Sequence, residues 1–99
     1  MFVMLTMIWP TKSSAEVGKV AVESLAKALP PYMERLGPYI AAGGDGLKGY
    51  SLYEIEKGHV QEGILEVTKR MVPYFSIEGY KYTIEPLSTA EEALSLIGL

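Results

Sequence analysis

The chain opens on Phe2–Trp9, an apolar stretch with the sequence FVMLTMIW that ends at Pro10. Side chains of a strand alternate between the two faces of a sheet, and both the even-numbered and the odd-numbered set are mostly apolar here. A strand of this kind is covered on both sides. The stretch therefore predicts a central strand whose sheet is buried on both faces.

A helix is expected directly after this strand. Ser13 and Glu16 have the spacing of a capping box, in which a hydroxyl and a carboxylate satisfy the first backbone N–H groups of a helix. Apolar residues then recur at spacings of three and four, which is typical of a helix with one core-facing side. The helix should run to about Leu29, because Pro30 and Pro31 cannot continue it.

A hairpin and a second helix follow. The segments Tyr39–Ala42 and Gly49–Glu56 read as strands, and Gly43–Gly46 is a turn rich in residues that tolerate positive φ. A helix is expected from about His59 to about Tyr74.

The last part of the chain predicts a strand and a short helix. Tyr80–Glu85 alternates as a strand does, and Ser88 and Thr89 each precede a glutamate by three residues, as helix caps do. The whole chain, residues 1–99, is thus expected to form one α+β domain. Its order of elements predicts a ferredoxin-like βαββαβ fold, with a four-stranded antiparallel sheet, two helices on one face and a short C-terminal helix.

Composition argues against several classes of function. The net charge is −3, and the nine Lys and Arg residues are spread along the chain, so nucleic-acid binding is not expected. There is no cysteine and a single histidine, and we expect neither a metal site nor a cofactor. The apolar start is too short to span a membrane, so we expect a soluble, cytoplasmic protein without a membrane partner.

Self-association follows from the first strand. Two helices on one side of a four-stranded sheet cover only one of its faces. The other face of Phe2–Trp9 is also apolar, and the last helix is too short to cover a whole sheet. A second copy of the chain, packed face to face by two-fold symmetry, is the expected cover.

The pattern resembles a known superfamily, the dimeric α+β barrels. The resemblance lies in Val3–Trp9, the helix beginning at Ser13, the hairpin turn at Gly43–Gly46, the helix ending at Pro73-Tyr74-Phe75 and the strand Tyr80–Glu85. It implies small ferredoxin-like domains whose sheets pack face to face as a dimer. The superfamily includes cofactor-free monooxygenases, lactone isomerases and haem-binding enzymes, so the resemblance does not select one function.

Two residues are candidates for a catalytic base. Glu54 shares a strand face with Tyr50 and Leu52, and a carboxylate in an apolar pocket has a raised pKa. His59 has a side chain whose titration suits a base or a haem ligand, although its place at the start of a helix argues against haem. An ordinary solvent-exposed position is the more common explanation for both residues.

A set of aromatic residues is the more suggestive feature. They lie near the ends of strands and helices, where they could line a cleft for a flat organic ligand. The candidates are Trp9, Tyr32, Tyr50, Tyr53, Tyr74 and Tyr82. Ordinary packing in the core or at an interface would explain the same residues.

Three functions remain open at this point. The first is a homodimeric barrel that binds a small apolar or aromatic molecule. The second is a cofactor-independent monooxygenase or isomerase, with Glu54 or His59 as its base. The third is a structural or regulatory module that acts through its sheet face or its last helix.

Overall fold

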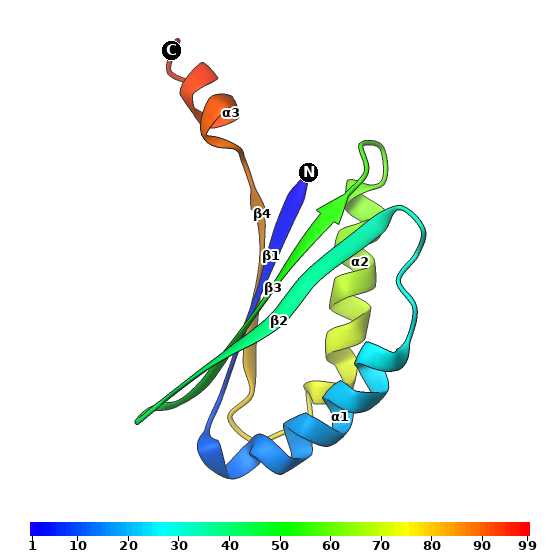
Figure 1. The fold of residues 1–99 in the computed structure, drawn as a ribbon, viewed down its shortest axis with the longest axis vertical. Helices are drawn as coiled ribbons and strands as arrows, with labels where there is room; N and C mark the ends of the chain where they lie inside the picture. Colours follow the sequence, from blue (N-terminus) through cyan, green and yellow to red (C-terminus); the bar gives the residue numbers. More distant parts are fainter.

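A computed structural model describes all residues, 1–99, as an α+β domain (Figure 1). The elements in chain order are β1 (Phe2–Trp9), a 3-10 turn (Thr11–Ser13), α1 (Ser14–Ala26), β2 (Met33–Gly43), β3 (Gly46–Ile55), α2 (Val60–Met71), a second 3-10 turn (Val72–Tyr74), β4 (Lys81–Leu87) and α3 (Ala90–Ser95). The predicted order of strands and helices is confirmed.

The four strands form one antiparallel sheet in the order β2-β3-β1-β4. This is the ferredoxin-like arrangement that the sequence predicts, with β1 and β3 in the centre. Helices α1 and α2 both lie against the same face of the sheet, and the opposite face is bare (Figure 1). We call these the helix-facing side and the open face.

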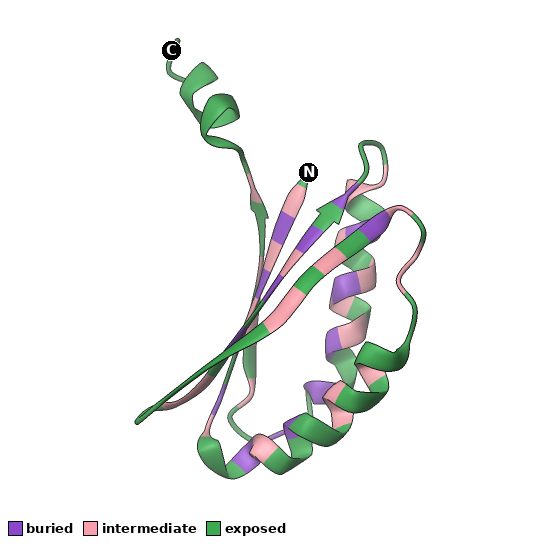
Figure 2. Cartoon of the chain, in the orientation of Figure 1, coloured by how far each residue is buried: buried purple, intermediate pink, exposed green.

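The side chains of β1 alternate between the two faces of the sheet, and the two sets differ in burial. Val3, Leu5, Met7 and Trp9 are buried, at 0% to 7% exposed, and form the centre of the core beneath the helices. The even-numbered residues lie on the open face and are only half-buried, except Ile8, which is exposed. The chain by itself therefore covers one of the two apolar faces of this strand. Figure 2 shows buried and half-buried positions alternating along β1.

The start of α1 differs from the prediction. Ser13 stands at the N-cap, but its side chain makes no capping hydrogen bond. Its hydroxyl instead donates to the carbonyl of Glu78 at 2.8 Å, which ties the start of α1 to the loop before β4. The predicted capping box of Ser13 and Glu16 is therefore wrong, because a tertiary partner takes the hydroxyl. The helix also ends at Ala26, three residues before Leu29.

The second strand is longer than its sequence suggests. It begins at Met33 rather than Tyr39, and its register against β3 shifts between Leu36 and Tyr39. Gly37, with φ +93°, takes up this irregularity, and a Cβ there would meet the carbonyl oxygen of Tyr50 at 2.7 Å. Gly and Pro together look like a strand end in the sequence, whereas a bulge accommodates both within one strand.

The C-terminal helix stands apart from the rest of the domain. Thr89 and Glu92 form the predicted capping box, with both hydrogen bonds present. The helix projects beyond the end of the sheet (Figure 1), and all of residues 88–99 are exposed. No helix of the chain combines the length and the apolarity that crossing a membrane would need.

Candidate functional site

A cavity of about 60 Å³ lies between the two main helices and the helix-facing side of the sheet. Its floor includes Leu5, Met7 and Trp9 of β1, and α1 contributes further apolar side chains. Eleven of the sixteen lining residues are hydrophobic, so the walls are mostly apolar. Small-molecule sites typically combine such walls with a few placed polar groups.

An aromatic stack forms one side of this cavity. The ring of Tyr80 stacks on Tyr74 with centroids 4.6 Å apart, and on Trp9 with centroids 6.1 Å apart. The indole Nε1–H of Trp9 donates to the hydroxyl of Ser14 at 3.2 Å, which fixes the orientation of the ring. The stack thus presents a rigid aromatic surface to the cavity.

The hydroxyls of Tyr74 and Tyr80 have raised pKa values and stay protonated well above neutral pH. Burial raises the pKa of Tyr74, and the nearby Tyr53 raises it further. Burial likewise raises the pKa of Tyr80, followed by the effects of Tyr74 and Tyr53. Each hydroxyl therefore serves as a neutral donor or acceptor; that of Tyr80 donates weakly to the Met71 sulfur at 3.9 Å.

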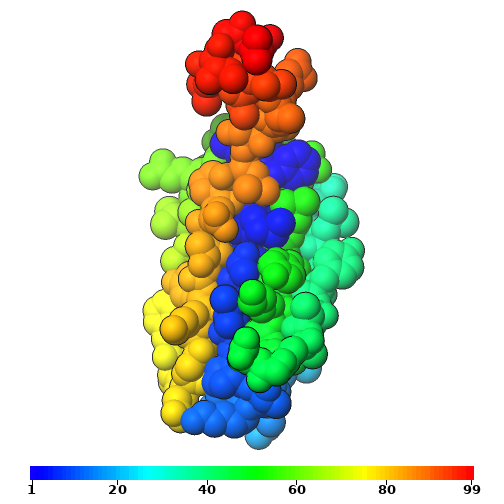
Figure 3. Space-filling view, turned by 90° about the vertical axis from the view of Figure 1, so that its left-hand side faces the viewer, coloured from blue at the N-terminus to red at the C-terminus, as the bar shows by residue number.

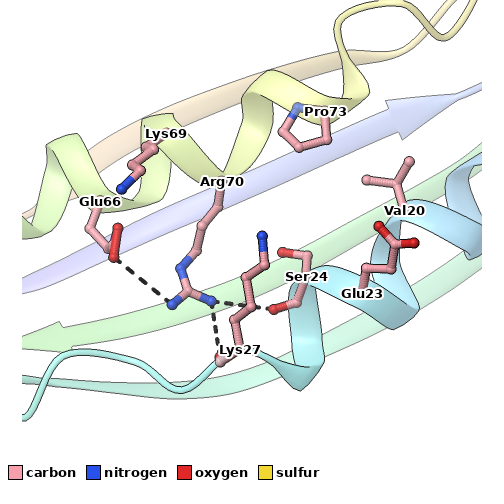
Figure 4. A pocket seen from close by; sticks show the side chains of 8 residues that line it. All are labelled: Val20, Glu23, Ser24, Lys27, Glu66, Lys69, Arg70 and Pro73. Carbon is pink, nitrogen blue, oxygen red and sulfur yellow. Dashed lines mark hydrogen bonds and ion pairs between the residues drawn. The ribbon is translucent and has the colours of Figure 1, made fainter.

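Arg70 lies between the cavity and a groove on the surface. The groove measures about 180 Å³ and runs between α1 and α2; Ser24 and Arg70 line both the groove and the cavity. Figure 4 shows the Arg70 side chain reaching from α2 towards the end of α1. Its guanidinium donates to the carbonyls of Ser24 at 3.3 Å, Lys27 at 3.2 Å and Ala28 at 2.7 Å.

Arg35 is the second cationic side chain of the cavity. It lies on β2 directly opposite Tyr53 of β3, on the helix-facing side of the sheet. It is half-buried, and no hydrogen bond or ion pair joins its guanidinium to another side chain. Ser51, only 2% exposed, lines the same cavity and adds a hydroxyl.

The predicted aromatic set divides among four places, one of which is beside His59, where Tyr32 lies. Trp9, Tyr53 and Tyr74 line the cavity. Tyr82 also points to the helix-facing side, but its ring stacks on Phe75, with centroids 6.1 Å apart, outside the cavity lining. Tyr50 pairs with Thr6 on the open face, so the sheet separates it from the cavity.

The structure does not bring the two candidate bases together. Glu54 is exposed on the open face, opposite Glu34 of β2. His59 lies at the N-terminal end of α2, stacked on Tyr32 with centroids 4.5 Å apart, and its Nδ1 is 3.5 Å from a Glu62 oxygen. Arg70 is about three helical turns away along α2. Neither base, nor Tyr32, lines the cavity, and their predicted roles stay predictions.

Sequence reasoning missed five polar residues of the cavity: Ser24, Arg35, Ser51, Arg70 and Tyr80. Arg35 was missed because its strand was expected to begin later. One signal was available for Arg70, since it follows Val67 by three residues and so lies towards the buried side of α2.

No group of three or more His, Asp or Glu side chains gathers where it could hold a metal ion. Comparison with known proteins gives no match to a family model and none to a curated protein.

Proposed function

We propose that this protein is a homodimeric binding protein of the dimeric α+β barrel type, and that it holds a small organic molecule in the cavity between its helices and its sheet. The observation that carries the binding proposal is the cavity itself. It joins a mostly apolar lining and a stacked aromatic wall to a few polar side chains from different elements. This combination is typical of ligand sites and not of a fully packed core.

The volume of the cavity limits its ligand. An apolar cavity of about 150 Å³ is known to take up benzene, and this one measures about 60 Å³. In the conformation seen here, the cavity therefore suits a molecule smaller than benzene. A larger aromatic molecule would enter only if Arg70 moved and joined the cavity to the neighbouring groove of about 180 Å³.

The only tryptophan of the chain gives a direct assay. Trp9 contributes a single indole N–H resonance to a 15N NMR spectrum, and its ring lines the cavity. We expect small organic molecules to shift this resonance saturably. Replacing Ala21, a lining residue on α1, by Met should fill the cavity and abolish the shift. The control Ala15→Met places the same side chain on the exposed side of α1.

Either of two results would contradict the binding proposal. One is the absence of any saturable shift with a panel of small neutral and anionic molecules. The other is an equal shift in Ala21→Met and wild type. The third function, an interaction module without a ligand, would then be favoured.

The open face supports the proposal of a homodimer. Figure 3 shows this face, with β1 and β3 between the outer strands and no helix over it. Its strands carry a broad set of apolar residues, which a monomer rarely leaves exposed: Phe2, Met4, Ile8, Leu36, Tyr39, Tyr50, Leu52 and Leu87.

The charges on the open face favour a second copy as the cover. Glu34, Glu54 and Glu85 lie towards one end of the strands, and Lys48 and Lys81 towards the other. If the two-fold axis runs perpendicular to the strands, the acidic end of one copy meets the basic end of the other. An axis parallel to the strands would instead oppose like charges. We infer the first arrangement.

The dimer proposal has a matched pair of variants. Leu36, on the open face, is 58% exposed, and Leu65, on the outer side of α2, is 62% exposed. Neither change to glutamate should unfold the monomer, but only Leu36→Glu places a charge in the proposed interface. Light scattering after gel filtration should give a dimer for wild type and Leu65→Glu, and a monomer for Leu36→Glu. A wild-type monomer would contradict the proposal.

The orientation can be tested with Lys48. Under the inferred arrangement, Lys48→Glu sets a new acid against the acidic end of the other copy and weakens the dimer. If the two-fold axis instead ran parallel to the strands, the same change would relieve the repulsion between lysines of the two copies and would strengthen the dimer. The double variant Lys48→Glu, Glu54→Lys restores the net charge and should recover the wild-type dissociation constant.

A further inference from the structure

The lining of the cavity includes positively charged side chains and no acidic one. The positively charged residues are Arg35 and Arg70. These are also the only arginines of the chain. An arginine inside an apolar site is normally paired with an acid or a hydrogen-bond acceptor, because its desolvation is otherwise unfavourable.

The positive charge of Arg70 is partly compensated, and one of its N–H groups has no hydrogen-bond partner. Its side chain is only 9% exposed, and the nearest acid, Glu66, approaches no closer than 4.0 Å. The carbonyls at the end of α1 accept hydrogen bonds from its two terminal nitrogens, where the helix dipole favours a cation. Its Nε is buried and has no partner.

Arg35 is half-buried and its guanidinium makes no hydrogen bond or ion pair, and a second hollow that Arg35 lines also includes Glu34 and Glu54. The position of Arg35 opposite Tyr53 makes it face the helices from within the sheet, and the salt bridges of the chain involve other residues. A strand residue on the apolar side of a sheet is ordinarily hydrophobic, so an arginine there has no evident role in packing. A planar guanidinium suits a carboxylate, which it binds with two parallel hydrogen bonds.

We propose that the ligand of the cavity is a short-chain organic monocarboxylate whose carboxylate binds Arg35. This inference rests on the proposed binding function and names its ligand class. Ser51 and Tyr53 lie beside Arg35 in the lining and supply hydroxyls for the remaining carboxylate lone pairs. The apolar chain of the ligand lies against the aromatic stack of Trp9 and Tyr80. A volume of about 60 Å³ sets the size of the whole molecule.

The experiment compares propionate with propionamide, which has nearly the same shape and no charge. Each is titrated into the 15N-labelled protein, and the Trp9 indole resonance is followed. Propionate should bind at least about tenfold more tightly than propionamide, because a charge-assisted pair with arginine is lost in the amide. Benzoate should bind more weakly than propionate, since its ring exceeds the cavity.

Two variants of Arg35 and one control variant test whether the carboxylate binds to the positive charge of Arg35. Arg35→Gln should weaken propionate binding by about tenfold or more and propionamide binding much less, because the amide loses only a neutral hydrogen bond. Arg35→Lys keeps the charge without the planar fork and should give an intermediate affinity. Lys19→Gln removes one positive charge from an exposed position of α1 and should bind as wild type does. Thermal unfolding of each variant checks that it folds.

The outcomes separate this inference from the proposed function. Equal binding of propionate and propionamide, unchanged in Arg35→Gln, would overturn the carboxylate inference and leave small-molecule binding in place. Competition by inorganic phosphate as strong as that by propionate would overturn the carboxylate class. Failure of every acid, amide and other small molecule of the panel to bind would overturn the proposed binding function itself.

Discussion

Two glycines in the middle of the main helices should respond in opposite ways to the same substitution. Gly63 of α2 is buried against β3, and an added Cβ would lie 2.5 Å from Cδ1, 2.9 Å from Cγ2 and 3.1 Å from Cγ1 of Ile55. Gly18 of α1 is exposed, and a Cβ there would meet nothing within 4 Å. The predicted change in stability follows from this difference alone.

Gly63→Ala should lower the free energy of unfolding. Ile55 is 0% exposed, so it cannot move aside without disturbing the core. Overpacking of this kind costs about 2–3 kcal/mol, and alanine returns about 1 kcal/mol through its higher helix propensity. The net effect is a loss of about 1–2 kcal/mol. Gly18→Ala has the gain in helix propensity without the overpacking, so it should raise the free energy of unfolding by up to about 1 kcal/mol.

Urea denaturation of both variants at one protein concentration measures this difference, since a dimer's stability depends on concentration. The double variant Gly63→Ala, Ile55→Val removes the nearest atom, Cδ1, and should recover part of the loss relative to Ile55→Val alone. If Gly63→Ala stabilised the protein as Gly18→Ala does, helix α2 would not pack on β3 as closely as described.

Two further predictions concern pH and the C-terminus. Burial raises the pKa of Tyr74 and Tyr80 above the ordinary value of 10.0, so the unfolded chain ionises first as the pH rises. Stability should therefore be complete below pH 10.0 and fall above it; urea denaturation on either side of this pH should show the fall, and Tyr80→Phe should reduce it. Truncation after Leu87 removes only exposed residues. It should change the free energy of unfolding of the domain by less than about 0.5 kcal/mol, and a larger loss would mean that α3 is packed against the domain or a second copy.

The fold was predictable because its signals are local. The alternation of Phe2–Trp9 and the apolar spacing of the helices decide where each element lies, and the structure agrees. The errors arose where distant residues compete with local ones. The hydroxyl of Ser13 donates a hydrogen bond to the carbonyl of Glu78, 65 residues away in sequence. No short-range sequence pattern predicts such a contact. Gly37 looked like a break, and only the pairing with β3 shows that it forms a bulge.

The site was less predictable, because it depends on which face of each strand meets the helices. Trp9 and Tyr53 were expected near a ligand and do line the cavity, whereas Tyr50 belongs to the other face. The difference is one of strand register, which an aromatic residue alone does not reveal. Arg35 was overlooked because a charged residue is ordinarily assigned to solvent. The extension of β2 back to Met33 is what places Arg35 on the helix-facing side of the sheet.

The two proposed properties depend on the same strand. The odd-numbered side chains of β1, among them Leu5, Met7 and Trp9, form the floor of the cavity, and the even-numbered ones form the middle of the open face. Because successive residues serve opposite faces, a second copy that covers the open face would also hold the cavity floor in place. Loss of the dimer in Leu36→Glu should therefore weaken ligand binding, although Leu36 does not line the cavity. An affinity in that variant equal to that of wild type would show that the two faces act independently.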